Sequence, residues 1–296
     1  MNLSEFMKKY RTRVDGLLEK SISDLPLVSE VLAKAMGHGL LLGGKRVRPF
    51  LVYATGHMLG ASDEVMDGPA AAIECIHAYS LIHDDLPCMD NDKLRRGQPT
   101  VHILFGEAQG MLAGDALQTL GFEILSHHKM PTELLENQLK MLGCLSTASG
   151  YSGMCGGQSL DLLSENCQVP LDKLEQIHVH KTGALIECAV MMGTLCVPQI
   201  PEEHQEKLRR YSRLIGLAFQ VHDDILDIIG DTETLGKTQG SDIANAKSTY
   251  PALMGLDKAQ EYERKLYGEA LDCLAELPYD TSVLKEFAEF IVSRQS

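Results

Sequence analysis

The sequence predicts an all-α fold for the whole chain, residues 1–296, as one domain. Apolar residues recur at three- and four-residue spacings in about ten segments, which is the spacing of amphipathic helices. No run alternates with a period of two over more than a few residues, and no Asn-Gly hairpin signal occurs. The breaks are short and contain Gly or Pro, so no polar linker separates two domains.

The residues at the segment ends agree with this assignment. In "VPLDKLEQ" and "IPEEHQEKL", proline and acidic residues stand near a helix start, where both are favoured. The longest irregular stretch is Gly230–Thr249, and a loop of this length in a compact domain is more often functional than idle. The expected helices are Leu3–Leu18, Leu25–Leu41, Pro49–Leu59, Val65–Leu86, Val101–His127, Thr132–Ser149, Leu171–Leu195, Glu202–Ile229, Tyr250–Ala275 and Asp280–Val292.

Composition restricts the class of protein and of partner. Apolar residues make up 44% and charged residues 23%, as in ordinary globular proteins, and no apolar stretch is long enough to span a membrane. There is no secretory signal, and the eight cysteines form no C-x-x-C pair, which favours buried thiols in a reducing cytoplasm over structural zinc. The net charge of −14 argues against nucleic acid, but divalent cations can join an acidic protein to a phosphorylated small molecule.

Two apolar helices end in similar acidic clusters, "SLIHDDLPCMD" and "AFQVHDDILD". Asp223 and Asp227 are four residues apart and therefore project from one helix face. Asp84 and Asp90 are six apart and would diverge in a continuous helix. Pro87 disfavours helical geometry before it, so Asp90 can fold back beside Asp84, and the two clusters could then face shared ligands.

Three interpretations of the clusters are open. A single aspartate at a helix end is usually solvated surface charge, but acids at helix C-termini oppose the macrodipole, and here that cost occurs twice. A carboxylate-bridged iron site or a metal phosphohydrolase is disfavoured because the clusters lack Glu-x-x-His spacing. Clustered Asp oxygens suit Mg²⁺, which usually also takes phosphate oxygens, so this interpretation predicts a polyphosphate substrate.

Basic residues near the clusters support a phosphorylated substrate. They occur in "GGKRVRP", "KLRRG", "HKTGAL" and "TLGKTQGSD", each at a helix end or in a glycine-containing loop. Any one group alone is ordinary surface charge. Four such groups in an acidic protein suggest two anion sites, one mediated by metal and one bound directly by arginine. The basic residues are Lys45, Arg46, Arg48, Arg95, Arg96, Lys181 and Lys237.

These motifs together resemble the trans-isoprenyl diphosphate synthases, and most of all the bacterial-type farnesyl diphosphate synthases within that family. The matching segments are "GGKRVRP", "SLIHDDLPCMDNDKLRRGQPT", "HKTGAL" and "FQVHDDILDIIGDTETLGKTQGSD", in the family's order. The resemblance runs from about Leu25 to Pro251. It implies the isoprenoid synthase fold, a single large all-α helical bundle around a central cavity, and a cytoplasmic homodimer.

The resemblance implies a prenyltransferase that condenses isopentenyl diphosphate with dimethylallyl or geranyl diphosphate to give (2E,6E)-farnesyl diphosphate. Three Mg²⁺ ions per active site would neutralise the leaving diphosphate, so that the allylic C–O bond ionises. The resulting cation would alkylate isopentenyl diphosphate, and loss of a proton would complete the new alkene. By resemblance Asp84 and Asp90 bind two ions and Asp223 the third, supported by Asp85, Asp224 and Asp227.

The substrate contacts are also assigned by resemblance. The groups expected around the allylic diphosphate and its reacting carbon are Arg95, Lys181, Lys237, Thr182 and Gln220. Those expected around isopentenyl diphosphate are Lys45, Arg48, His77 and Arg96. His77 lies seven residues before Asp84, on nearly the same helix face, which fits two substrates that meet along this helix.

Product length follows from the resemblance alone. An aromatic residue five positions before the first motif favours the 15-carbon product in this family, and Tyr79 has that position, with Ser80 next to it. Ideal helix geometry places Tyr79 about 140° from Asp84, so helix geometry does not yield this role. The chain end "VSRQS" carries only Arg294, whereas bacterial relatives often have a basic tail that closes over isopentenyl diphosphate.

Three alternatives remain. A geranylgeranyl or geranyl diphosphate synthase would use the same chemistry. A class I terpene cyclase usually has an Asn/Ser/Glu metal motif where this chain has "DDILD". A non-catalytic partner subunit tends to lose motif aspartates, and all six are present here.

Overall fold

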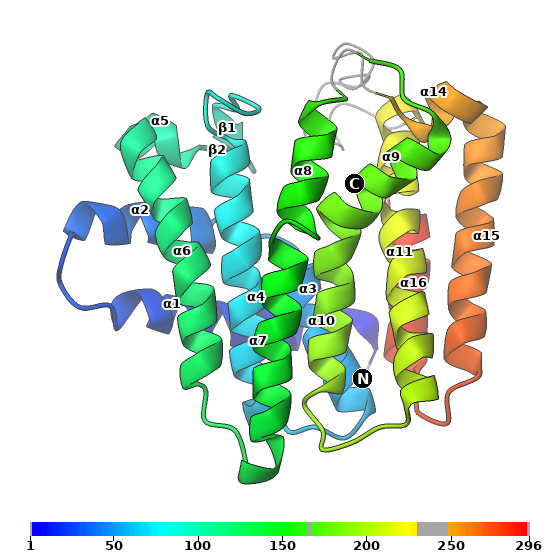
Figure 1. The fold of residues 1–296 in the computed structure, drawn as a ribbon, viewed down its shortest axis with the longest axis horizontal. Helices are drawn as coiled ribbons and strands as arrows, with labels where there is room; N and C mark the ends of the chain where they lie inside the picture. Colours follow the sequence, from blue (N-terminus) through cyan, green and yellow to red (C-terminus); the bar gives the residue numbers. More distant parts are fainter. Residues whose placement is uncertain (1, 165–166, 230–247, 295–296) are drawn as a thin grey trace. The chain divides into compact units, whose positions relative to one another are not determined.

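Helices make up nearly all the regular structure of the residues that the computed structural model describes, 2–164, 167–229 and 248–294 (Figure 1). The all-α prediction is therefore confirmed. The α-helices are α1 (Leu3–Ser23), α2 (Glu30–Leu41), α3 (Val47–Met58), α4 (Asp63–Asp84), α5 (Val101–Phe105), α6 (Glu107–His127), α7 (Leu135–Ser149), α8 (Met154–Leu162), α9 (Leu171–His178), α10 (Ala184–Thr194), α11 (Glu202–Ile229), α14 (Tyr250–Met254), α15 (Leu256–Ala275) and α16 (Ser282–Ser293). The short elements are a 3₁₀ turn η1 (Thr132–Leu134), a π-helical turn η2 (Val179–Gly183) and strands β1 (Leu94–Arg95) and β2 (Gln98–Pro99). None of the described helices is both long and apolar enough to cross a membrane.

The chain divides into two compact units. The first unit consists of Met1–Leu142 and Leu195–Pro198, and the second of Gly143–Thr194 and Gln199–Ser296. Helix α7 crosses the boundary between them. That residues 1–296 form a single domain stays a prediction.

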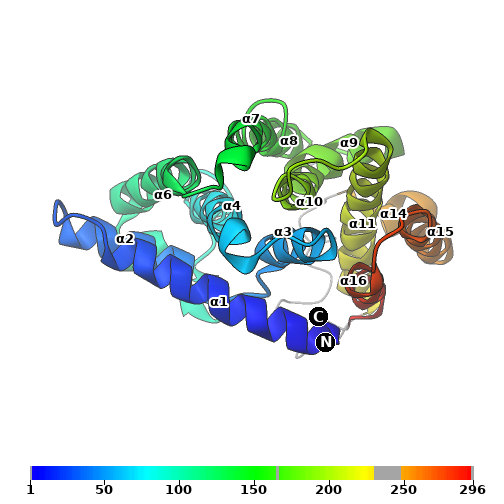
Figure 2. The ribbon, with the colours of Figure 1, turned by 90° about the horizontal axis from the view of Figure 1, so that it is seen from below.

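The first unit is built around α4, whose residues 68–76 are all buried. Helices α3 and α6 pack along α4, and α1 lies across α2, α3 and α4 (Figures 1 and 2). Helix α1 contributes a stripe at four-residue intervals, the spacing of one helix face. The buried members of this stripe are Phe6, Tyr10, Val14 and Leu18.

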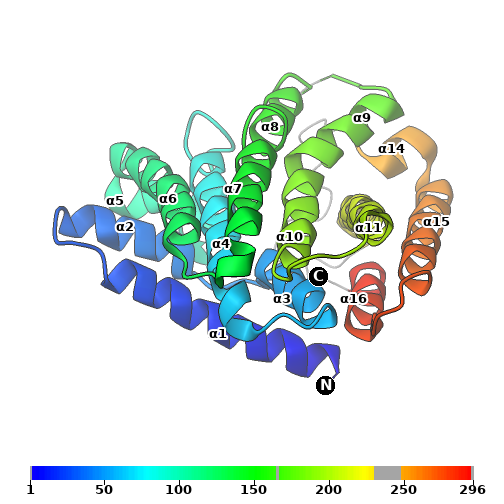
Figure 3. The ribbon, with the colours of Figure 1, turned by 60° about the horizontal axis from the view of Figure 1, so that its bottom comes forward.

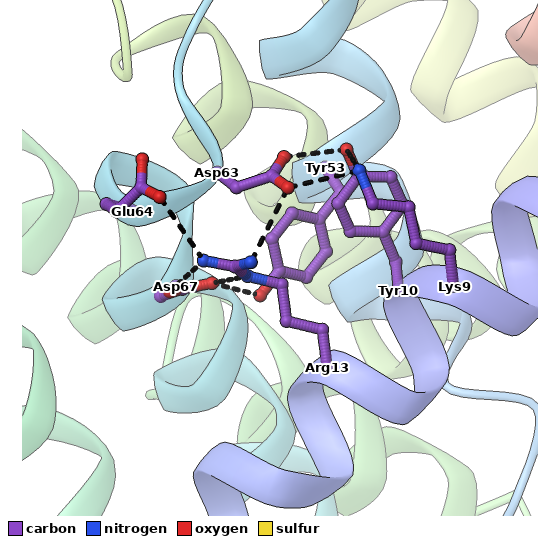
Figure 4. A network of polar contacts seen from close by, with 7 residues as sticks. All are labelled: Lys9, Tyr10, Arg13, Tyr53, Asp63, Glu64 and Asp67. Atoms are coloured by element: carbon purple, nitrogen blue, oxygen red, sulfur yellow. Dashed lines mark hydrogen bonds and ion pairs between the residues drawn. The ribbon is translucent and has the colours of Figure 1, made fainter.

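A polar network joins α1 to α3 and α4 (Figure 4). Arg13 donates two hydrogen bonds to Asp67, from Nε at 2.6 Å and from Nη2 at 2.8 Å. Tyr53 also donates to Asp67, at 2.7 Å, and burial raises the pKa of its hydroxyl. Tyr10 stacks on Tyr53, with ring centroids 4.3 Å apart, and donates to Asp63 at 2.7 Å. Hydrogen bonds and ion pairs thus hold α1 against α3 and α4 in addition to its buried apolar side chains.

The second unit is organised by α11, which has 28 residues. Helices α10, α15 and α16 pack against it, and Figure 3 shows α11 nearly end-on among them. One core cluster of this unit consists of Leu174, Ala218, Val221, Ile225, Tyr250, Ala259 and Leu266. The predicted helix Leu171–Leu195 is present as α9, η2 and α10 in succession, with a π-helical turn in the middle.

Several predicted boundaries were wrong at glycines. The predicted helix Val101–His127 is broken at Gly106, and Tyr250–Ala275 is broken at Gly255, with φ angles of 88° and 86°. Only glycine adopts such positive φ at low cost, and a helix cannot continue through it. The prediction also missed α8 (Met154–Leu162), whose glycine-rich start weakens the helical pattern.

The β1–β2 hairpin was also missed. Leu94 pairs with Pro99 and Arg95 with Gln98, and the two turn residues, Arg96 and Gly97, have φ angles of 52° and 75°. Two central residues with positive φ are typical of a type I′ turn, which usually begins with Asn, Asp or Gly. Arg96 in that position gives no hairpin signal in the sequence.

Candidate active site

The first acidic cluster lies in a tight turn at the C-terminal end of α4. Helix α4 ends at Asp84, and Pro87 follows within the turn. The backbone N–H of Asp90 donates to the carbonyl oxygen of Asp84 at 2.8 Å, so the chain returns to the helix end. The predicted fold-back of Asp90 beside Asp84 is therefore present. Asp84 is half-buried and Asp90 is exposed, which leaves both accessible from solvent.

Asp85 differs from its neighbour Asp84 because it is 3% exposed and bonded to Arg95. The Nε of Arg95 lies 2.9 Å from both carboxylate oxygens, and its Nη2 lies 2.6 Å from Oδ1. Burial raises the pKa of Asp85, and the charge and hydrogen bonds of Arg95 oppose that shift. Burial lowers the pKa of Arg95, but the bonds to Asp85 outweigh burial and raise it. Asp85 thus positions the guanidinium predicted to contact the allylic diphosphate.

His77 lies among arginines. Burial holds the pKa of His77 well below its usual range, and the positive charges of Arg48, Arg96 and Arg95 lower it further. The ring is therefore neutral near pH 7 and offers a hydrogen bond without adding a charge. Three of the residues predicted for isopentenyl diphosphate, Arg48, His77 and Arg96, are brought together from α3, α4 and the hairpin turn.

Arg46 organises the "GGKRVRP" segment. It is 5% exposed, and it donates to Glu74 at 2.7 Å, to Asp15 at 2.8 Å and to the carbonyl oxygen of Leu40 at 2.9 Å. The sequence showed Arg46 as one of several basic residues without a role of its own. A buried ion pair is tolerated when its hydrogen bonds are made, so Arg46 is a structural anchor for the segment.

The neighbours of Arg46 differ from it in their surroundings. Lys45 is exposed, and the buried Nε of Arg48 has no hydrogen-bond partner among the described residues. Burial also lowers the pKa of Arg48, so a bound anion would counter the cost of burying its charge. Arg96 donates to the carbonyl oxygen of Gly43, and a Cβ on Gly44 would lie 2.7 Å from its Cζ. The glycine pair thus admits the guanidinium of Arg96.

The second acidic cluster lies on the last turns of α11. Asp223 and Asp227 share one face of this continuous helix, as predicted, and Asp223 is the more exposed. Oδ1 of Asp223 accepts a hydrogen bond from Arg294 at 2.6 Å. Asp224 accepts one from the backbone N–H of Tyr250 at 2.9 Å and so fixes the start of α14. Asp223 and Asp224 therefore differ in their contacts.

Lys181 and Thr182 lie in the π-helical turn η2, and both are half-buried. The Nζ of Lys181 donates to Asp161 at 2.5 Å, and a Cβ on Gly157 would lie 2.1 Å from the backbone N of Lys181. A π-helical turn redirects the side chains that follow it and is frequent at functional sites. Asp161 was not expected from the sequence, although Gly156 and Gly157 before it indicate close packing.

The remaining predicted residues are distributed as follows. Gln220 is half-buried on α11, three residues before Asp223. Tyr79 is 4% exposed, with its ring edge-on to that of His83 at 5.8 Å between centroids, and the hydroxyl of Ser80 donates to the carbonyl oxygen of His77 at 2.9 Å. Lys237 and the predicted loop up to residue 247 lie outside the described residues.

Comparison with known proteins identifies the family. The family model described as polyprenyl synthetase matches residues 29–288, nearly the whole chain. The chain belongs to the polyprenyl synthetase family. The isoprenyl synthase family predicted from the motifs is therefore confirmed.

Individual members of the polyprenyl synthetase family match over nearly their full length. Farnesyl diphosphate synthase from Escherichia coli (strain K12) is 55% identical over 280 residues, which cover 94% of each chain. The protein of the same name from Haemophilus influenzae is 51% identical over 296 residues, 100% of this chain and 99% of the relative. Among solved structures, geranylgeranyl pyrophosphate synthetase from Pyrococcus horikoshii superposes with a TM-score of 0.88 at 31% identity and covers 99% of this chain and 98% of that one.

Proposed function

We propose that this protein is a farnesyl diphosphate synthase, which adds isopentenyl diphosphate to dimethylallyl diphosphate and then to geranyl diphosphate. The observation that carries the proposal lies on α4, where the acidic turn at Asp84 comes seven residues after His77, a histidine whose pKa is lowered by burial and by the charges of Arg48 and Arg96. The full-length similarity to two bacterial farnesyl diphosphate synthases supports the same activity. The acidic turn would bind one diphosphate through metal ions, and the basic residues near His77 would bind the second diphosphate directly.

The isopentenyl site is proposed at Arg48, His77 and Arg96, with Lys45 from the adjoining loop. Within the part of the chain that the structure describes, the buried Nε of Arg48 has no acceptor, and a phosphate oxygen would satisfy this donor. Guanidinium groups bind phosphate through paired hydrogen bonds, which hold it in one orientation. The neutral ring of His77 adds a hydrogen bond among these cations without increasing their mutual repulsion.

The carboxylates fit divalent metal. Mg²⁺ prefers oxygen ligands, keeps several waters and takes phosphate oxygens, so it needs few carboxylates from the protein. No three acidic, His or Cys side chains lie at metal-binding positions within residues 2–164, 167–229 and 248–294, so each cluster would supply part of a coordination shell. We assign the binding of three Mg²⁺ ions to Asp84, Asp90 and Asp223. Bound Mg²⁺ would supply neutralisation of the charge that develops on the leaving diphosphate.

The chain's own cations complete the allylic site. Arg95 and Lys181, with Lys237, would donate charge-assisted hydrogen bonds to the allylic diphosphate. Asp85 pairs with Arg95 and Asp161 pairs with Lys181, so both cations are held in position by the protein. Thr182 and Gln220 would line the reacting allyl group. No nucleophilic side chain is required, because the double bond of isopentenyl diphosphate is the nucleophile.

The product is proposed to have 15 carbons. The buried ring of Tyr79, with Ser80 beside it, would limit chain growth near the first acidic turn. The same fold occurs in a relative named geranylgeranyl pyrophosphate synthetase, so the fold itself does not choose the product. A geranylgeranyl diphosphate synthase is therefore the second candidate.

The assembly is proposed to be a cytoplasmic homodimer without a nucleic-acid partner. Large apolar side chains are exposed along α5 and α6, and a second copy of the chain would cover them. They are Ile103, Leu104, Met111 and Leu112. The net charge of −14 opposes binding to nucleic acid.

The proposal is tested by product analysis. Purified protein is incubated with labelled isopentenyl diphosphate and dimethylallyl diphosphate, with Mg²⁺ or with a chelator, and the dephosphorylated products are sized. A main product of 15 carbons that requires Mg²⁺ is expected. A 20-carbon main product would contradict the farnesyl assignment, a cyclic hydrocarbon would indicate a cyclase, and no product would indicate a partner subunit.

A further inference from the structure

Arg294, at the C-terminal end of α16, occupies one oxygen of the proposed metal ligand Asp223. Its Nη2 lies 2.6 Å from Oδ1 of Asp223. The side chain of Arg294 is only 6% exposed, whereas that of Asp223 is 44% exposed. A guanidinium thus covers one side of a carboxylate that otherwise faces solvent.

Several further contacts hold Arg294 in this position. Its guanidinium carbon lies 4.0 Å from the ring centroid of Phe219, a cation–π contact on α11. Its Nη2 also donates to the carbonyl oxygen of Phe219 at 3.3 Å, and its Nε donates to that of Ile291 at 3.3 Å. The pair is therefore more strongly built than a solvated surface ion pair, in which both side chains move freely.

The backbone of Arg294 is anchored as well. Nε2 of His222 lies 2.9 Å from the carbonyl oxygen of Arg294, and Nδ1 of His222 lies 2.5 Å from Glu263 on α15. His222 precedes Asp223 in the acidic motif, so this motif binds the end of α16 through two consecutive residues. Helices α11, α15 and α16 all belong to the second unit, and these contacts lie within it.

We propose that Arg294 is a place-holding cation, which balances the charge of Asp223 until a divalent metal displaces it. The inference rests on the proposed metal role of Asp223. The guanidinium and a metal ion compete for the same oxygen, and both lower the cost of concentrating aspartates at a helix C-terminus. Metal bound at Oδ1 would break the Arg294–Asp223 bond and loosen the end of α16. The order of the C-terminal end of α16 would then depend on whether a metal ion is bound at Asp223.

Metal affinity tests the competition directly. Free Mn²⁺ is measured by electron paramagnetic resonance as it is added to the wild type, Arg294→Gln and Arg210→Gln, without substrate. Arg210 is the matched control, because it is 64% exposed, pairs with Glu269 at 3.1 Å and carries the same charge. Arg294→Gln is expected to bind Mn²⁺ about three- to tenfold more tightly than the wild type, because it loses a partly exposed charged hydrogen bond that competes with the metal. Arg210→Gln is expected to bind Mn²⁺ as tightly as the wild type does. Unchanged or weaker binding by Arg294→Gln would overturn the proposal.

The release of α16 is tested on the wild type, which avoids any folding defect of a variant. Hydrogen exchange of residues 288–294 is compared with and without Mn²⁺, and faster exchange is expected with metal. In Asp223→Asn these amides should exchange faster already without metal and should not respond to it. Exchange that Mn²⁺ leaves unchanged in the wild type would contradict the displacement.

The same data separate this inference from the proposed function. If Asp223→Asn binds Mn²⁺ as well as the wild type does, the metal role of Asp223 fails, and the place-holding role fails with it. If Asp223→Asn binds Mn²⁺ weakly and Arg294→Gln does not bind it more tightly, the metal role stands and the place-holding role alone is wrong.

Discussion

Neighbouring aspartates in the two acidic motifs have different surroundings, although both motifs contain the same His-Asp-Asp sequence. Asp84 is half-buried at the end of α4, whereas Asp85 is buried against Arg95. On α11, Asp223 pairs with Arg294, whereas Asp224 accepts a backbone hydrogen bond at the start of α14. One aspartate of each pair therefore supports the structure, and the other is the better candidate for metal.

We predict that Asp84→Ala and Asp223→Ala each lower turnover by several orders of magnitude with folding intact. Each variant removes a proposed metal ligand and with it part of the neutralisation of the leaving diphosphate, and the loss of one such electrostatic group costs about a hundred- to a thousandfold in rate. The turnover number is measured at saturating substrates, and circular dichroism checks the fold. Asp115→Ala, at a carboxylate that is 62% exposed, is the control and should retain normal activity. Near-normal rates in either motif variant would refute the metal assignment.

At the scale of elements, helix ends and breaks decide where the functional side chains lie. Pro87 stops α4 and lets the chain fold back, so Asp90 meets Asp84 through a backbone bond of 2.8 Å. The positive φ of Arg96 turns the hairpin so that its guanidinium reaches Gly43. The π-helical turn η2 carries Lys181 and Thr182. In each case the residues assigned to the proposed active site lie where the regular α-helix is interrupted.

The network that joins α1 to α3 and α4 makes part of the stability pH-dependent. Burial acts to raise the pKa of Asp63, but hydrogen bonds from Tyr10 and Lys9 and the charges of Lys9 and Arg13 outweigh it and lower the pKa. The unfolded state then binds more protons than the folded state at acidic pH. The contribution of Asp63 is therefore present above its unfolded pKa, about 3.9, and is lost as the pH falls through its lower folded pKa.

We accordingly predict that Asp63→Asn lowers the free energy of unfolding at pH 7, and that its difference from the wild type shrinks as the pH falls below about 4. Urea denaturation of both proteins at several pH values measures this difference. A difference for Asp63→Asn that stays constant or grows in acid would contradict the role given to Asp63.

At the scale of the whole molecule, the family match and the distribution of charged residues both favour a metal-dependent diphosphate site. The polyprenyl synthetase model covers residues 29–288, and each compact unit carries one of the two aspartate motifs at the end of one of its helices. The net charge of −14 would repel a diphosphate at long range. Divalent metal and the local arginine cluster would both overcome that repulsion at the site.

The proposed homodimer leads to a prediction at this scale. Ile103→Glu combined with Leu112→Glu places charge on the exposed apolar face of α5 and α6, and we expect a monomer, because an interface core excludes unpaired charge. Light scattering coupled to size exclusion measures the mass. Val28→Glu is the control, since Val28 is 88% exposed outside any helix and should leave the dimer intact. A dimer that persists in the double variant would reject this face as the interface.

The sequence by itself determined the helical class, most helix positions and the family. Helices follow from a local period of 3.6 residues, and the family follows from motifs that are contiguous in the chain. The fold-back at Pro87 was predictable for the same reason, because proline acts on the residue directly before it. The sequence could not place the breaks at Gly106 and Gly255, since glycine is compatible with both a helix and a turn.

The partners of the charged residues were decided by the tertiary structure alone. Arg46 meets Glu74 across 28 residues, Lys181 meets Asp161 across 20, and Arg294 meets Asp223 across 71. No local period encodes such a pairing, because it depends on which helix faces pack together once the apolar residues are buried. The sequence therefore identified the charges of the candidate site, and packing decided which of them pair with one another.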